Sequence, residues 1–287
     1  MSSKSLQSVL WRSLQKQWRG YQKNLRRCRK EMSEKAIHRL RVQCRRMSST
    51  ATVLAAVIPP KVPLAMGDAL KEQLELFARL RDVQVQWHFV EKQRERFPET
   101  APFRRFLAKR EKRLTRRAAR RLKRLGSSKL ENLVKQIGKQ LANEPATRNP
   151  VSEQAVRIAL ERTFADVLAL YRKITLSRTT SIHRTRVAFK KYRYMTEAMP
   201  PDLLSVHPAH RRRMHDYQTR MGAIQDAEVL QEMWRKFLGK KKARRLADIP
   251  FTQEIERRRK KSITVFSKRG DELLQFAPFR LRSRSAS

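Results

Sequence analysis

The stretch 182–194, which reads IHRTRVAFKKYRY, has an earlier counterpart at 37–47, which reads IHRLRVQCRRM. The two align without a gap and pair His38 with His183, Arg41 with Arg186, Arg45 with Lys190 and Arg46 with Lys191. Each copy combines one histidine with several arginine or lysine residues at helical spacing. A segment of this kind, occurring twice, decides how the rest of the chain is interpreted.

A second pair of segments repeats the spacing further along the chain. LRDVQV occupies 80–85 and IQDAEV occupies 224–229, with Asp82 matching Asp226. The distance between the copies is nearly the same for both pairs, which indicates an internal duplication rather than chance similarity. We therefore expect one domain over 1–287, built from halves at 1–142 and 150–276 and followed by a disordered tail at 277–287.

Helix geometry places the cations of each copy on one face, because residues three, four and seven apart are neighbours on a helix. One stripe contains His183, Arg186, Lys190 and Arg193, and its counterpart contains His38, Arg41 and Arg45. The other face is expected to anchor each helix in a core through Ile182, Val187, Phe189 and Tyr194, and through Ile37, Leu40, Val42, Cys44 and Met47. The stripes then face a cavity, a groove or solvent, where an anionic partner relieves the repulsion between like charges.

The composition also indicates a polyanionic partner. The chain has 287 residues, with 68 Lys+Arg against 26 Asp+Glu and a formal net charge of +42. Such an excess opposes compaction unless anions are nearby. Nucleic acid, an anionic membrane surface and an inorganic phosphate polymer all fit, and composition does not choose among them.

Several other classes of protein are disfavoured. Cys28 and Cys44 lack the spacing of a disulfide framework or a CxxC motif. The longest apolar run, 51–58, is too short to span a bilayer, and the first residues lack a signal-peptide pattern, so a cytoplasmic protein without membrane contact is expected. Metal binding by the histidines between 207 and 215 is opposed by the cationic run Arg211–Arg213. No catalytic constellation or phosphate-binding glycine loop occurs, so we expect neither an enzyme nor a cofactor.

Helical periodicity runs through every long segment and only seven glycines interrupt it, which predicts an all-α fold. Helices are expected at 6–29, 34–57, 66–97, 103–125, 129–141, 152–174, 180–199, 208–238 and 251–276. Ser33 is expected to cap the second of these helices. The sequence NEPATRNP at 143–150 is expected to be a linker.

The pattern His-x-x-Arg-x-x-x-Lys/Arg, present twice and followed each time by an Asp-bearing segment, resembles CHAD domain proteins, the conserved-histidine α-helical domains. The resemblance covers nearly the whole chain. It implies two pseudo-symmetric antiparallel helical bundles and binding of inorganic polyphosphate, with association with polyphosphate granules in a bacterial cytoplasm. One departure is Ser48, which stands where the second copy has Arg193. The first site is therefore expected to hold anions less strongly or to take a cation from another helix.

We accordingly expect a non-enzymatic polyphosphate-binding protein whose basic cavity is lined by both motif helices. The candidate polyphosphate-binding residues are His38, Arg41, Arg45, Arg46, His183, Arg186, Lys190, Lys191 and Arg193. Arginine suits this task because its planar fork donates two parallel hydrogen bonds to a phosphate. Off the main stripe, Arg39, Arg46, Arg184 and Lys191 are weaker candidates. Asp82 and Asp226 are expected to lie behind the site and orient an Arg or His by a hydrogen bond.

Other interpretations remain open at this point. The cations could form an ordinary solvated face, and most of those on the very basic helix 103–125 are expected to do so, although some could extend the binding path. An RNA-binding protein is the main alternative, and nucleic acid is expected at least as a weaker polyanionic partner. Aromatic residues at 7% and the lack of an RRM, KH or helix-turn-helix signature count against it. A phosphatase is disfavoured because no acidic cluster could hold Mg²⁺.

Overall fold

The computed structural model describes residues 5–143, 150–199, 206–242 and 249–278. Within these ranges it contains α-helices, two short 3-10 segments and no strand, so the all-α prediction is confirmed. Most of the expected linker and nearly all of the expected disordered tail lie outside the described residues. The helices are α1 Leu6–Glu31, α2 Glu34–Leu54, α3 Lys61–Leu76, α4 Ala78–Lys92, α5 Ala101–Arg124, α6 Ser128–Asn143, α7 Pro150–Tyr171, α8 Thr179–Ala198, α9 Pro208–Lys242 and α10 Pro250–Arg269.

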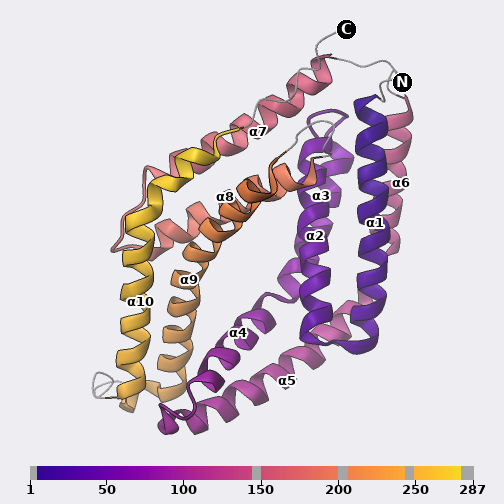
Figure 1. The fold of residues 1–287 in the computed structure, drawn as a ribbon. Helices are drawn as coiled ribbons and strands as arrows, with labels where there is room; N and C mark the ends of the chain where they lie inside the picture. The colour runs from indigo at the N-terminus through magenta and orange to yellow at the C-terminus, as the bar shows by residue number, and fades with distance from the viewer. Residues whose placement is uncertain (1–4, 144–149, 200–205, 243–248, 279–287) are drawn as a thin grey trace.

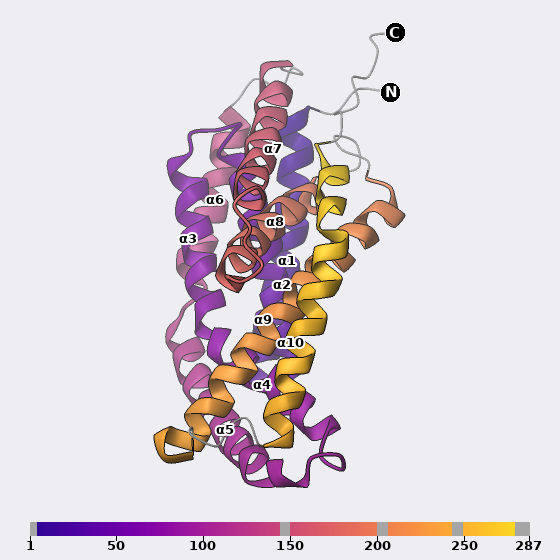
Figure 2. The same ribbon diagram turned by 90° about the vertical axis from the view of Figure 1, so that its left-hand side faces the viewer.

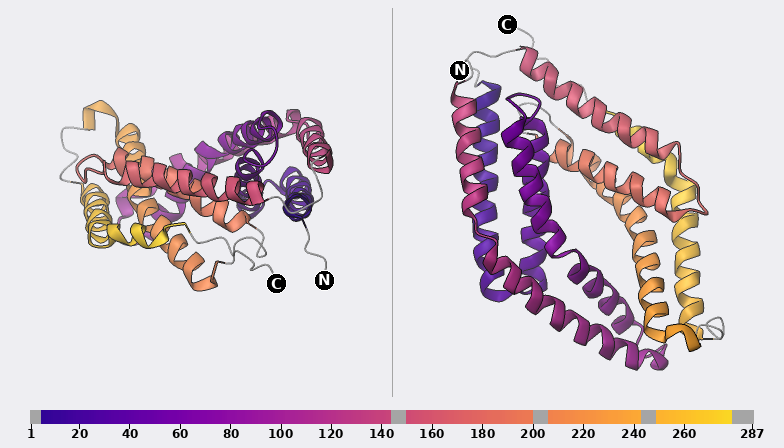
Figure 3. Two further views of the ribbon diagram at one scale, coloured as in Figure 1. Left: turned by 90° about the horizontal axis from the view of Figure 1, so that it is seen from above. Right: turned by 180° about the vertical axis from the view of Figure 1, so that it is seen from behind.

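The helices form the four sides of an open frame (Figure 1). One side consists of α1, α2, α3 and α6, and a second consists of α4 and α5. The pair α9 and α10 forms the third side, and α7 and α8 form the fourth. The view from behind shows the same four sides (Figure 3). The two motif segments lie on α2 and α8, and the Asp-bearing segments lie on α4 and α9.

Two apolar clusters hold the frame together. The larger one joins the sides that carry α2 and α8, and it buries Leu14, Met47 and Tyr192 completely. The smaller one is rich in aromatic rings and lies at the corner where α4 and α5 meet α9 and α10. There the ring of Trp234 packs edge-on against Phe103 at 5.0 Å and against Phe251 at 5.2 Å between centroids. Edge-to-face pairs of this kind add to the stability that burial of the rings provides.

The start of α2 confirms one local prediction. Ser33 has extended backbone angles, and its hydroxyl accepts a hydrogen bond of 3.2 Å from the amide of Ala36. The side chain thereby satisfies one of the amides that the first turn of a helix leaves unpaired. This cap sets the register of the first motif, because His38 follows one turn later.

The prediction of a single helix over 66–97 is wrong. The chain instead forms α3 and α4, which are separated at Phe77, and a 3-10 turn at Pro98–Thr100 follows. Here the carbonyl of Leu74 accepts from the amide of Phe77 at 3.3 Å and from the guanidinium of Arg41 at 2.8 Å. A side chain from α2 therefore satisfies a carbonyl at the break. The expected helix 251–276 is likewise divided into α10 and a 3-10 segment, η3, at Gly270–Phe276.

The apolar anchor of the second motif helix also differs from expectation. Ile182 and Phe189 are buried as predicted, but Val187 is 53% exposed and does not contribute to the core. From Tyr192 to Thr196 every residue of α8 is buried, Arg193 included. This end of α8 is enclosed on all sides, so a simple division into an apolar and a cationic face fails there.

Candidate functional site

The two motif helices pack against each other, which brings their cations together. Lys190 of α8 records this proximity most clearly. Burial lowers the pKa of its ammonium group, and the nearby guanidinium groups of Arg45, Arg186, Arg41 and Arg193 lower it further, to about 6. Two of these four arginines belong to the other motif helix. Residues far apart in the sequence thus form one cluster, in which like charges oppose one another.

Arg41 and Arg186 occupy matching positions in the two copies but have different surroundings. Burial and the neighbouring Arg45 lower the pKa of Arg41 to about 10, and its guanidinium donates to the Leu74 carbonyl. Burial also lowers the pKa of Arg186, whereas Asp226 raises it. The Arg186 guanidinium lies against Gly222 of α9, 3.5 Å from the position that a Cβ atom would occupy there. Both arginines are therefore held by the protein before any ligand arrives.

Both motif histidines are kept largely neutral at pH 7. Burial lowers the pKa of His38, and Arg81, Arg45 and Arg41 lower it further. Burial and Arg186 lower the pKa of His183, while a polar contact with Gln225 raises it. Two buried nitrogens in this region, Nδ1 of His183 and Nε of Arg186, have no hydrogen-bond partner among the described residues. Because buried polar atoms are nearly always paired, these positions are suited to meet a ligand.

The two aspartates of the second repeated segment lie close to each other. Although solvent reaches Asp82, surrounding protein raises the pKa of its carboxyl group; Arg41 opposes this rise and Asp226 adds to it. Burial raises the pKa of Asp226, and Arg186 lowers it. The amide of Gln86 on α4 donates to the backbone carbonyl of Asp226 at 3.0 Å, which joins the two segments directly.

The expected hydrogen bonds from these aspartates are not found. Within the described part of the chain, neither carboxylate makes a direct hydrogen bond or ion pair with Arg41, Arg186 or a motif histidine. Asp82 and Asp226 influence the arginines through space, as the opposite charges nearest to them.

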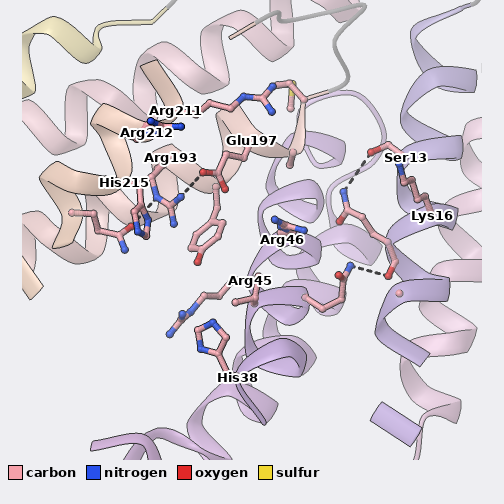
Figure 4. A pocket seen from close by; sticks show the side chains of 18 of the residues that line it. Ser13, Lys16, His38, Arg45, Arg46, Arg193, Glu197, Arg211, Arg212 and His215 are labelled. Atoms are coloured by element: carbon pink, nitrogen blue, oxygen red, sulfur yellow. Dashed lines mark hydrogen bonds and ion pairs between the residues drawn. The ribbon is translucent and has the colours of Figure 1, made fainter. Parts of the chain in front are cut away.

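A cavity of about 1170 Å³ opens beside this cluster, between α1, α2, α8 and α9 (Figure 4). Its described lining contains seven arginine or lysine side chains and a single carboxylate, that of Glu197. The cations are Arg12, Lys16, Arg45, Arg46, Arg193, Arg211 and Arg212. His38 and His215 also line it. A concave surface with this balance of charge concentrates anions, because field lines from several cations converge in it.

One of these cations is already engaged by the protein. Nε of Arg193 donates to Oε1 of Gln218 at 2.9 Å, and the same guanidinium forms an ion pair with Glu197 one turn further along α8. Its Cζ atom lies 4.4 Å from the centre of the Tyr194 ring. The Arg193 side chain is only 7% exposed, so it contributes to the cavity wall as a fixed charge.

The structure thus places the predicted binding residues in four different surroundings. Four of them line the cavity, namely His38, Arg45, Arg46 and Arg193. Arg41, Arg186 and Lys190 belong to the adjoining cluster through their charges. His183 lies beside Arg186 and Lys190, outside the cavity lining. Lys191 is exposed and has no described contact with the cavity or the cluster.

The sequence did not indicate the cavity cations contributed by other helices. Arg12 and Lys16 come from α1, while Arg211 and Arg212 come from the first turns of α9. No motif marks them, and only their charge and helical spacing could have drawn attention to them. The pair on α1 belongs to the helix that packs against α2, the first motif helix.

Two further features are settled for the described residues. They contain no group of three His, Cys, Asp or Glu side chains placed to hold a metal ion. None of the helices is both long and apolar enough to cross a membrane.

The comparisons with known proteins agree with this fold. The family model of the CHAD domain matches residues 12–235. The chain belongs to the CHAD domain family. No curated protein matches it closely. Among solved structures, this CHAD domain is similar to the one from the plant Ricinus communis, with 17% identity over 98% of this chain and 96% of that one and a TM-score of 0.65.

A second similar structure is that of PptA from Streptomyces chartreusis. It is 16% identical over 95% of this chain and all of that one, also with a TM-score of 0.65. At these identities the likeness establishes the fold alone, and the side chains of the site have to be argued from this CHAD domain itself.

Proposed function

We propose that this CHAD domain binds inorganic polyphosphate, without catalysing a reaction on it, in the cavity between its two motif helices. The observation that supports this most directly is the described cavity lining, in which seven arginine or lysine side chains face a single carboxylate beside the buried Lys190. Burial and four neighbouring guanidinium groups lower the pKa of the Lys190 amine to about 6. A bound polyanion brings negative charge that favours the protonated amine. Binding of the ligand therefore restores the proton on Lys190.

The surrounding side chains suit a chain of phosphates. Arg45 and Arg46 reach the cavity from α2, and Arg211 and Arg212 reach it from α9 (Figure 4). The guanidinium groups can each donate two hydrogen bonds to phosphate oxygens, while the neutral histidines donate one. Since the described lining contains a single carboxylate, the cavity holds few groups that would repel a phosphate. Localisation to polyphosphate granules in the cytoplasm follows as part of this proposal.

A competition experiment distinguishes polyphosphate from nucleic acid at this site. Labelled polyphosphate is bound at physiological salt, and unlabelled polyphosphate or single-stranded RNA is added at equal phosphate concentration. We expect the unlabelled polyphosphate to displace the label at a much lower concentration, because the cavity offers RNA bases few aromatic rings on which to stack. The described lining contains one tyrosine, Tyr194, and Arg193 packs against its ring. Equal displacement by RNA would refute the proposal.

A matched pair of variants tests the position of the site. Arg45→Gln/Arg46→Gln removes two cavity cations, whereas Arg39→Gln/Arg184→Gln removes two exposed arginines of the same motifs that do not line the cavity. The first pair should weaken polyphosphate binding by about 30- to 1000-fold, at roughly 1–2 kcal/mol for each of the two charge-assisted contacts. The second pair should change it less than about threefold. Titration by fluorescence anisotropy measures both, and equal losses would place the ligand elsewhere.

A further inference from the structure

Helix α5 carries a second, separate concentration of positive charge. Its outer side presents Arg105, Lys109, Lys112, Arg116, Arg120 and Lys123, all of them exposed. The intervals of three and four residues place these six on one face of the helix, in a row that rises about 27 Å. None of them lines the cavity between the motif helices.

The other face of α5 explains why this row points outward. Phe103, Leu107, Ala118 and Leu122 are buried, and the helix packs chiefly against α4. In Figure 1, α5 forms the lower edge of the frame with α4 on its inner side, and Figure 2 shows the same edge after a quarter turn. The helix is therefore a convex rod at the border of the molecule, not the wall of a pocket.

No described carboxylate neutralises the row. The acid on α5 itself, Glu111, accepts a hydrogen bond of 3.0 Å from Gln84 of α4 on the inner side. The nearest ion pair joins Arg104 to Glu91 at 3.0 Å, also toward α4. Six unpaired like charges on a rigid rod repel one another, and an external anion of matching length would relieve that repulsion.

We propose that α5 binds the phosphate backbones of double-stranded DNA without reading the base sequence. An α-helix with its side chains is about 10–12 Å across, and the major groove of B-form DNA is about 12 Å wide. A helix lying along this groove has phosphates on both sides, at one negative charge per about 1.7 Å of duplex axis. The cationic row faces the groove in this arrangement, and Arg113, Arg117 and Arg124 extend it along one side, toward the phosphates of one strand.

Three other polyanions fit this rod less well. Single strands are held by stacking of bases on aromatic rings, and the phenylalanines of α5 are buried or turned toward the inner side, where Phe103 and Phe106 pack with Phe237. Stable insertion into a membrane surface requires large apolar side chains beside the cations, and no large apolar side chain of α5 is exposed. Double-stranded RNA has a major groove too narrow and deep for side chains to read. The surface does not depend on the proposed polyphosphate site.

A matched comparison within the chain tests the assignment. Arg105→Gln/Lys109→Gln/Lys112→Gln/Arg116→Gln removes four cations from α5. The control, Arg19→Gln/Lys23→Gln/Arg26→Gln/Lys30→Gln, removes four exposed cations from α1 at the same intervals and with the same two arginines and two lysines. Glutamine preserves helix propensity in both, and circular dichroism confirms that each variant is folded. Binding to a labelled duplex of about 20 base pairs, two helical turns, is measured by anisotropy over a range of salt concentrations.

We expect the α5 variant to lose more than about tenfold in affinity for the duplex and to lower the salt slope of log K by about 3 to 4, with similar effects on two unrelated sequences. The α1 variant should stay within about threefold of the wild type. Polyphosphate binding should be unchanged within about threefold in the α5 variant, which separates this surface from the cavity.

Four results would overturn the proposal. These are no duplex binding by the wild type, equal losses in the two variants, tighter binding of single-stranded DNA or anionic vesicles than of the duplex, and a parallel loss of polyphosphate and DNA binding. The last would assign α5 to the polyphosphate path instead.

Discussion

The two motif helices carry related sequences but contribute differently to the cavity. On α2, His38 and Arg46 are exposed, and Arg45 also lines the cavity. On α8, the matching residues Lys190 and Lys191 do not line the cavity, and the helix contributes Arg193 instead, which is tied to Gln218 and Glu197. The difference arises from the neighbours, since α9 and η3 cover α8 while the cationic side of α2 is left facing the cavity. The cavity thus receives more accessible charge from α2, through Arg45 and Arg46, and a buried, fixed charge from α8, through Arg193.

The largest expected consequence concerns stability and follows from the burial of Arg193. Arg193→Ala leaves Glu197 and Gln218 without their partner in a largely buried environment, so we expect the free energy of unfolding to fall by about 3 kcal/mol. Ser48, the matching residue of α2, has no such pair, and Ser48→Ala should change it by less than about 0.5 kcal/mol. Urea denaturation of the ligand-free protein measures both.

A second substitution tests the cause of that loss. In Arg193→Ala/Glu197→Ala the carboxylate is removed together with its partner, so at least about 1 kcal/mol should be recovered relative to the sum of the two single changes. Strictly additive effects would show that the ion pair does not explain the destabilisation.

The next effect is a pH dependence that only the α8 copy should show. Free lysine has a pKa of 10.5, and folding lowers that of Lys190 to about 6. Between these values the unfolded chain binds a proton that the folded protein does not, so stability should rise with pH, by up to about 1.4 kcal/mol per unit between pH 7 and 8. Above this range the raised pKa values of the buried thiols of Cys28 and Cys44 oppose the rise. Urea denaturation at several pH values should show this rise in the wild type and a flat profile in Lys190→Met.

Saturating polyphosphate provides the control for this pH effect. It should return the proton to Lys190 and flatten the wild-type profile as well. A rise with pH that persists in Lys190→Met would mean that another group is responsible.

Several of these features were predictable from the sequence because they depend on local spacing. The helical class, the cap at Ser33 and the burial of Ile37, Leu40 and Phe189 follow from periodicity and from the chemistry of the first turn. The motif cations likewise identified the cluster around Lys190, because identical spacing in two copies placed them on comparable helical faces. The assignment of these residues to polyphosphate binding stays a prediction.

The remaining features depend on contacts between distant segments. The apolar pattern Leu70, Leu74, Phe77 continues into α4 without a sign of a break. At the break, Arg41 of another helix donates to the Leu74 carbonyl, and a contact of this kind cannot be predicted from local sequence. Val187 has a regular place in the apolar pattern of α8, yet no element covers it. The cations of α1 and α9 reach the cavity only through the packing of the frame.

The smallest predicted effect is a change in polyphosphate affinity caused by Glu197, the one carboxylate in the described lining of the cavity. Glu197 competes with a phosphate for Arg193, so Glu197→Gln should free that guanidinium for the ligand and tighten polyphosphate binding by about three- to fivefold. Glu31→Gln is the matched control, because Glu31 also forms an ion pair one turn away from its arginine, Arg27, but on the exposed surface of α1. Removing that charge should alter affinity by less than about 1.5-fold, since solvent and salt screen it. Calorimetric titration resolves the two values. If both variants gain equally, net charge governs binding, and the fixed pair on α8 has no bearing on how the ligand is held.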